Sequence, residues 1–234
     1  MKKISVLSIC LVLFVSSFAI AEEQCIEAVN SGCLERLQDE INDGITRTMT
    51  VPYNDPMAFS PLTKIIGDTA HIKIYSALSA QDELYLYDDL QLLESKEEVK
   101  NIKVYLNSPG GGAYSGFAIG DQFIRIKDRF KMSVWASGIV ASAAVMVFLS
   151  FDERYASENT FFMVHEVAIG NTGAMDASEV KTMDKLFDKL TDRYVQVLVK
   201  VSNVLEENWK EMIKETTWFS AGEAKEWGLV TEVR

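Results

Sequence analysis

One serine and one histidine form the most informative pair in the chain. Ser142 lies in the run Ala136–Met146, where its hydroxyl stands in a small, apolar stretch that continues to Leu149. His165 follows later, and the chain holds only two histidines, the other being His71. A serine hydroxyl becomes a nucleophile when a neighbouring imidazole takes its proton. The pair therefore predicts acyl-transfer chemistry with Ser142 as nucleophile and His165 as general base.

Each residue alone also has an ordinary structural explanation. A serine in the first turn of a helix is most often a cap. Its local context, with Gly138 four residues before it, differs from the Gly-x-Ser-x-Gly turn of α/β-hydrolases. A histidine at the end of a strand often makes a structural hydrogen bond. The chemistry therefore depends on the two side chains being brought together.

Three consecutive glycines, Gly110–Gly112, offer a second chemical feature. Glycines after a strand permit positive φ and leave backbone N–H groups uncovered, so they can point at an anion or an oxyanion. A simple tight turn explains the same pattern. No Gly-Lys-Ser/Thr follows, and the spacing of a dinucleotide fingerprint is absent, so nucleotide binding is not predicted.

The surrounding residues alternate between strand and helix patterns. Strands are predicted over 71–75, 102–106, 133–136, 154–156, 161–164 and 229–233, and helices over 81–93, 114–126, from 142 onward, 176–201, 205–213 and 220–228. This alternation predicts βαβ units with a mainly parallel sheet and functional groups at the carboxyl ends of strands. The loops predicted over 107–112 and 137–142 both fall at such ends.

The predicted helix over 176–201 is the longest. Asp176 and Glu179 can form a capping box at its start, as Ser220 and Glu223 can for the last helix. Its apolar residues recur every three or four positions: Val180, Met183, Leu186, Phe187, Leu190, Tyr194, Val197 and Leu198. The stripe predicts a wide packing face that a second subunit could cover.

The N-terminus has the three parts of a secretory signal peptide. Met1–Lys3 is basic, Ile4–Ile20 is almost wholly apolar, and Ala19 and Ala21 are small residues at the −3 and −1 positions. We predict a signal peptide over 1–21, an extension over 22–60, a domain over 61–234, and a periplasmic location without membrane association after cleavage. A retained membrane anchor is the alternative.

Removal of Lys2 and Lys3 with the signal leaves 21 basic and 34 acidic residues, a formal charge of −13. Such a surface repels nucleic acid, so no nucleic-acid partner is expected. Cys25 and Cys33 remain, and a disulfide between them would close a small loop in an oxidising compartment. No second cysteine pair or nearby histidine completes a metal site, and no cofactor is predicted.

An ordered set of motifs runs from about Ile65 to Val233: Tyr105–Gly111, Gly116, Ile119–Asp121, Gly138–Ser142, Phe162–His165, Phe219–Ala224 and Trp227–Val230. Together these motifs resemble the proteolytic subunit of the Clp protease. The resemblance implies a crotonase-like ββα superhelix, an α/β fold with a mainly parallel sheet and a long protruding helix. It agrees with the alternation of strands and helices.

The resemblance also implies roles for individual residues. Ser142 matches the nucleophile and His165 the general base, while the backbone amides of Gly110 and Ala143 match the oxyanion hole. The third member of the family's triad is an aspartate, and here that position is Thr216. A hydroxyl can orient the imidazole but cannot stabilise the imidazolium as a carboxylate does. The enzyme is then slow, recruits another carboxylate such as the adjacent Glu215, or works as a dyad.

These observations predict an exported, ATP-independent serine endopeptidase that cleaves peptides or unfolded polypeptides bound in extended form. Export removes the chain from ATP, so no ATP-driven unfoldase partner is expected, while the resemblance implies a homo-oligomer. A first alternative is a catalytically inactive binding or scaffold protein. A second is a crotonase-like acyl-CoA enzyme, which export and the lack of an evident basic phosphate site disfavour.

Overall fold

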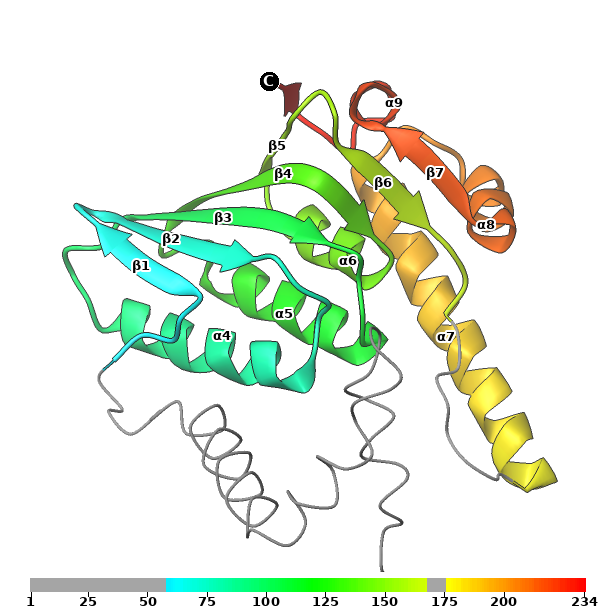
Figure 1. Cartoon of the computed structure of the whole chain (residues 1–234). Helices are drawn as coiled ribbons and strands as arrows, with labels where there is room; N and C mark the ends of the chain where they lie inside the picture. The colour runs from blue at the N-terminus through cyan, green and yellow to red at the C-terminus, as the bar shows by residue number, and fades with distance from the viewer. Residues whose placement is uncertain (1–57, 168–175) are drawn as a thin grey trace, which may run out of the picture. The chain divides into compact units, whose positions relative to one another are not determined.

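The computed structural model describes residues 58–167 and 176–234. The predicted signal peptide, almost all of the 22–60 extension and the cysteine pair lie outside these residues. The elements, shown in Figure 1, are β1 (Thr63–Ile66), β2 (Thr69–Ile74), α4 (Ala80–Glu94), β3 (Asn101–Ser108), α5 (Ala113–Ile126), β4 (Lys131–Ala141), α6 (Ala143–Leu149), β5 (Glu153–Ala156), β6 (Phe161–Val164), α7 (Ala177–Val201), α8 (Glu206–Glu215), β7 (Thr217–Ser220), α9 (Ala221–Glu226) and β8 (Glu232–Val233).

The sheet is mainly parallel, as predicted. Its strand order is β1-β2-β3-β4-β5-β8, and β6 pairs with both β4 and β7. Of the strand pairs in the described part of the chain, only β1–β2 and β6–β7 are antiparallel. Parallel pairing of β3, β4 and β6 brings their carboxyl ends to one edge, which is where the glycine loop, Ser142 and His165 follow.

Strand β4 is longer than predicted. The loop expected over 137–142 is wrong, because the strand continues to Ala141. The first half of β4 pairs with β5 and its second half with β6. The register against β3 shifts between Leu106 and Ser108. Gly138 takes a φ of 69° at this irregularity, and the Ile139 N–H donates to Asn107 Oδ1 at 3.1 Å. A side chain from the neighbouring strand thus keeps the chain extended through the glycine.

The helices cover the sheet unequally. Helices α4 and α5 lie against one face of β1–β3 (Figure 1), and all seven residues of α6 are buried. Helix α7 buries Tyr194, Val195 and Leu198 in its C-terminal half, whereas its N-terminal half extends beyond the sheet with Val180 50% exposed. The long protruding helix is therefore confirmed. Among the described residues, no helix is long and apolar enough to cross a membrane.

Both predicted capping boxes are present. The Asp176 carboxylate accepts from the N–H groups of Ser178 and Glu179, and Ser220 and Glu223 cap α9 reciprocally. These contacts satisfy N–H groups that no carbonyl within the helix can reach. They fix where α7 begins after the segment that follows His165 and where α9 begins after β7.

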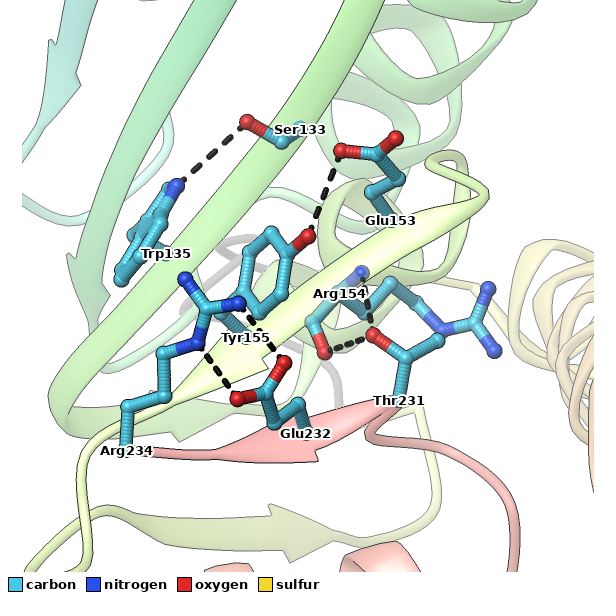
Figure 2. A network of polar contacts seen from close by, with 8 residues as sticks. All are labelled: Ser133, Trp135, Glu153, Arg154, Tyr155, Thr231, Glu232 and Arg234. Atoms are coloured by element: carbon cyan, nitrogen blue, oxygen red, sulfur yellow. Dashed lines mark hydrogen bonds and ion pairs between the residues drawn. The ribbon is translucent and has the colours of Figure 1, made fainter.

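A buried arginine fastens the C-terminal segment to β5. Arg154 is 8% exposed, and its guanidinium donates to the carbonyls of Phe151 (2.6 Å), Leu229 (2.6 Å) and Gly228 (3.1 Å). Figure 2 shows that the Thr231 hydroxyl accepts a hydrogen bond from the Arg154 N–H and donates one to the Arg154 carbonyl. Burial lowers the pKa of Arg154, but an arginine stays charged at any physiological pH. Peptide carbonyls accept the hydrogen bonds of the guanidinium, and the nearby Asp152 carboxylate opposes the lowering of its pKa.

Arg154→Met is expected to lower the free energy of unfolding by about 3 kcal/mol, because several buried carbonyls lose a charged donor at once. Denaturant unfolding of the two proteins measures the difference. Arg125→Met is the matched control, since Arg125 is 43% exposed and makes a surface pair with Glu94 at 2.8 Å. Its cost is expected to stay below about 1 kcal/mol. Equal costs for the two substitutions would contradict the assigned role of Arg154.

Candidate active site

Ser142 occupies a strained turn between β4 and α6. Its backbone has φ 55° and ψ −127°, a conformation that glycine adopts readily and other residues rarely do. Its N–H donates to the Met163 carbonyl at 2.8 Å, and its own carbonyl accepts from the Val145 N–H and the Tyr194 hydroxyl. Contacts from β6, α6 and α7 thus hold one residue in an unfavourable geometry that presents its hydroxyl at the sheet edge.

His165 follows directly after β6 and meets Ser142. The distance between His165 Nε2 and Ser142 Oγ is 2.8 Å. The pairing of β4 with β6 explains this approach, because Ala141 lies opposite Met163 and both chains leave the sheet at the same edge. Both side chains are partly exposed. The two residues singled out from the sequence are therefore brought together in the geometry that proton transfer requires.

Tyr194 is a further residue of the site. It was predicted only as part of the α7 packing stripe, yet its hydroxyl donates to the Ser142 carbonyl at 3.2 Å. Burial raises the pKa of Tyr194, so the phenol stays protonated and keeps donating. Sequence periodicity marked the face of the helix but not this hydrogen bond, which spans 52 residues.

The glycine loop, Gly110–Gly112, packs between Leu78 and the turn at residues 141–143 that carries Ser142. Leu78 N–H donates to the Gly110 carbonyl, and Gly112 N–H donates to the Leu78 carbonyl. A Cβ on Gly110 would lie 2.6 Å from the Ala141 carbonyl oxygen, and one on Gly111 would lie 2.3 Å from that of Leu78. Only glycine fits these positions, which also have positive φ.

The Gly110 amide was expected to donate to an oxyanion, but its N–H already donates to another group. Gly110 is buried, and its N–H donates to Ser108 Oγ at 3.2 Å. Gly111 is exposed and lines the cavity beside Ser142. Among the described residues, none accepts a hydrogen bond from the Gly111 N–H. Ala143 also lines the cavity, and as the first residue of α6 its N–H has no acceptor within the helix.

Close packing of α5 on α6 positions Ala143. A Cβ on Gly116 would lie 2.7 Å from the Ala143 carbonyl oxygen and 2.8 Å from its Cβ. Both distances are too short for any real side chain, so the two helices meet at a glycine. The start of α6, which carries the Ala143 amide, is therefore set by a residue on the neighbouring helix.

Gly116→Ala is expected to destabilise the fold by about 1–2 kcal/mol, since overpacking outweighs the gain in helix propensity. The rate of any reaction at Ser142 is expected to fall as well, because α6 must shift away from the site. Denaturant midpoints and initial rates measure both effects. Gly222→Ala is the control, as its Cβ would meet only Ser220 Oγ, at 3.7 Å, and stability should be unchanged or slightly higher. A Gly116→Ala protein as stable and active as the control would refute this packing argument.

The serine and histidine open onto a cavity of about 620 Å³. Its walls are the glycine loop, the start of α5, the turn that carries Ser142, residues 165–167 and α7. The side chains that line it are mostly apolar and include Phe117, Met146, Val167, Met183, Phe187 and Leu190. Such a lining suits the apolar side chains of an extended peptide. In the described part of the chain, no cluster of three or more His, Cys, Asp or Glu side chains is arranged to hold a metal ion.

Thr216 stands where the third member of the site was expected but supplies no carboxylate. Val164 and Thr217 form the last pair of the antiparallel β6–β7 ladder, so His165 and Thr216 are the residues just beyond that pair. Thr216 ends α8 in the left-handed region, with φ 57°, and is exposed. Glu215 precedes it and is also exposed. Within residues 58–167 and 176–234, no carboxylate hydrogen-bonds to the His165 imidazole.

The fold and the site together define the class of protein. A mixed α/β fold carries a strained serine within hydrogen-bonding distance of an imidazole, next to backbone amides at a helix start, which is the arrangement of a serine hydrolase site. The profile of the Clp protease family matches residues 57–234. The chain belongs to the Clp protease family, a family of peptidases.

Individual relatives agree with this assignment. The chain is 30% identical over 146 residues to ATP-dependent Clp protease proteolytic subunit 2 of Treponema denticola, covering 62% of this chain and 71% of the relative. It is 30% identical over 138 residues to proteolytic subunit 3 of Rhizobium etli, covering 57% and 68%. The solved structure of a ClpP1 mutant from Listeria monocytogenes superposes with a TM-score of 0.62 at 25% identity, covering 70% of this chain and 90% of that one. The predicted crotonase-like fold is thereby confirmed.

Proposed function

We propose that this chain is an exported, ATP-independent serine endopeptidase that cleaves peptides or unfolded polypeptides. The observation that carries the proposal is the 2.8 Å contact between His165 Nε2 and Ser142 Oγ at a serine held in a strained turn. Strain at one functional residue persists only where surrounding contacts impose it. Here those contacts come from Met163, Val145 and Tyr194.

The mechanism follows from this geometry. His165 Nε2 takes the hydroxyl proton as Ser142 Oγ bonds to the peptide carbonyl carbon, which gives a tetrahedral oxyanion. Collapse of this intermediate breaks the C–N bond, and the imidazolium gives its proton to the leaving amine. Water then repeats the sequence on the acyl-enzyme and releases the acid.

Two backbone amides are proposed to stabilise the oxyanion, and removal of one such donor costs about 3–4 kcal/mol in other serine hydrolases. Ala143 remains the donor predicted from the sequence. Its partner is the Gly111 N–H rather than that of Gly110, because Gly111 lines the cavity and Gly110 donates to Ser108. Gly110 instead fixes the loop against the turn that carries Ser142.

Export and assembly belong to the same proposal. The relatives from Treponema and Rhizobium are named ATP-dependent, whereas the signal predicted over 1–21 would carry this chain to a compartment without ATP. An unfoldase partner is therefore not proposed. The half-exposed Val180 on the protruding half of α7 supports self-association through that helix. An inactive scaffold is the second candidate, and the absence of a carboxylate at Thr216 favours it.

Hydrolysis of an internally quenched, unfolded polypeptide by the purified chain, with no nucleotide added, tests the proposal. Cleavage that disappears in His165→Ala supports the peptidase. A folded protein that binds the polypeptide without cleaving it would favour the scaffold.

A further inference from the structure

One side chain of the catalytic cavity has not been given a role. Among the described residues that line the cavity, Glu166 carries the only carboxylate, and no lysine or arginine lines it. The remaining lining is apolar, backbone, hydroxyl or the His165 imidazole. A single carboxylate therefore lines a cavity whose other described side chains are uncharged or, in His165, an imidazole, in a chain whose net charge is −11.

The charge on Glu166 is available to a ligand. The side chain is exposed, and no lysine or arginine of the described residues pairs with it. Tyr194, the buried tyrosine of the cavity, donates its hydroxyl to the Ser142 carbonyl instead. A cationic group entering the cleft would thus meet an unpaired carboxylate, and an acidic group would be repelled.

The position of Glu166 along the chain indicates which part of a substrate it faces. His165 must return its proton to the leaving amine, so the peptide beyond the scissile bond passes the imidazole. Glu166 and Val167 continue the cavity wall directly after His165. This segment therefore faces the leaving-group side of the substrate, while the glycine loop faces the carbonyl that is attacked.

We propose that Glu166 selects substrates that carry a lysine or arginine on the leaving-group side of the scissile bond, within two residues of it. The selection rests on the proposed peptidase function and adds the substrate class to it. The apolar lining receives uncharged side chains nearby, and the carboxylate adds attraction for a cation and repulsion for an acid. Differential binding of this kind appears in kcat/KM.

The effect is moderate because Glu166 is exposed to solvent. Exposed pairs contribute little, whereas partial enclosure by the cleft strengthens the attraction, so we expect a preference of about 3- to 10-fold for lysine over glutamine. Salt screens exposed charges, so about 0.5 M NaCl should reduce the preference. A preference based on side-chain shape alone would not depend on salt.

The test uses three sets of quenched peptides that differ only in carrying lysine, glutamine or glutamate after the scissile bond, with cleavage sites identified by mass spectrometry. For the wild type, kcat/KM is expected to rank lysine above glutamine above glutamate. Glu166→Gln should remove the ranking and Glu166→Lys should invert it. The control Glu158→Gln removes another exposed carboxylate, one outside the cavity, and should leave the ranking intact.

A ranking that survives Glu166→Gln, or a wild type without any ranking, would overturn the proposal. Anisotropy titration of the same peptides with Ser142→Ala separates this result from a failure of the peptidase function. If the wild type cleaves nothing but Ser142→Ala still binds lysine peptides more tightly, and this preference disappears in the double variant with Glu166→Gln, the selectivity stands and the peptidase function fails. Equal binding of all three sets would reject the selectivity itself.

Discussion

Replacing Ser142 with alanine is expected to lower peptide hydrolysis by at least about 10³-fold, because loss of a nucleophile or its base removes the covalent step. The oxyanion amides and the binding cleft remain, so the residual rate should still exceed that of the uncatalysed reaction. Initial rates on a quenched peptide measure the loss. His165→Ala should lower the rate to a similar residual value. The double variant should lose little further activity, since the two groups act as a unit.

The same position offers a stability test that separates function from fold. Ser142 holds φ 55° and ψ −127°, which costs a non-glycine residue about 1–3 kcal/mol. Ser142→Gly and Ser142→Ala both remove the hydroxyl, but only glycine relieves the strain. We expect Ser142→Gly to be more stable than Ser142→Ala by about 1 kcal/mol, after allowance for the flexibility of glycine in the unfolded chain. Equal unfolding free energies would show that the turn is not strained.

Thr216→Asp is expected to raise peptide hydrolysis by at least about tenfold. Thr216 and His165 directly adjoin Val164 and Thr217, the last pair of the β6–β7 ladder. A carboxylate that reached the imidazole from position 216 could orient it and stabilise the imidazolium. Loss of this acid in a complete triad costs about 10⁴-fold, which sets the ceiling for the gain. The gain should fall short of it, because the exposed position leaves the new carboxylate partly solvated. The ratio of kcat values on one peptide measures the effect.

Backbone strain at Thr216 requires a control for the Thr216→Asp experiment. Thr216 has φ 57°, which a β-branched residue adopts at a cost and which Asp or Asn tolerates much better. Thr216→Asn should therefore match Thr216→Asp in stability without adding a negative charge. If the asparagine variant gains as much activity, strain relief rather than the carboxylate explains the gain. If neither variant gains, position 216 does not support the imidazole.

Local patterns were sufficient for the parts of the site that lie at element ends. Ser142 and His165 each follow a strand, and parallel strands leave a sheet at one edge, so their meeting followed from the βαβ pattern. The capping boxes at Asp176 and Ser220 are likewise local, since every partner lies within three residues. These features depend on no contact between distant segments.

Local sequence patterns did not predict the features that depend on contacts between segments distant in the sequence. Strand β7 was missed because its pairing with β6, far away in the sequence, defines it. Strand β1 was also missed, although its partner β2 follows after a short turn. The continuation of β4 through Gly138 depends on the side chain of Asn107, on another strand. The Gly110 amide was expected in the oxyanion hole, but its bond to Ser108 Oγ depends on how the loop folds back. Glu166 carried no motif and emerged only once the cavity lining was known.

Reaction with a fluorophosphonate probe tests the central claim most directly, since the probe modifies only a serine activated as a nucleophile. The purified chain is incubated with the probe, and the adduct is located by peptide mass spectrometry. We predict labelling at Ser142 that disappears in His165→Ala. No labelling of the folded wild type, or labelling that persists without His165, would contradict the assignment of Ser142 and His165 as a working catalytic pair.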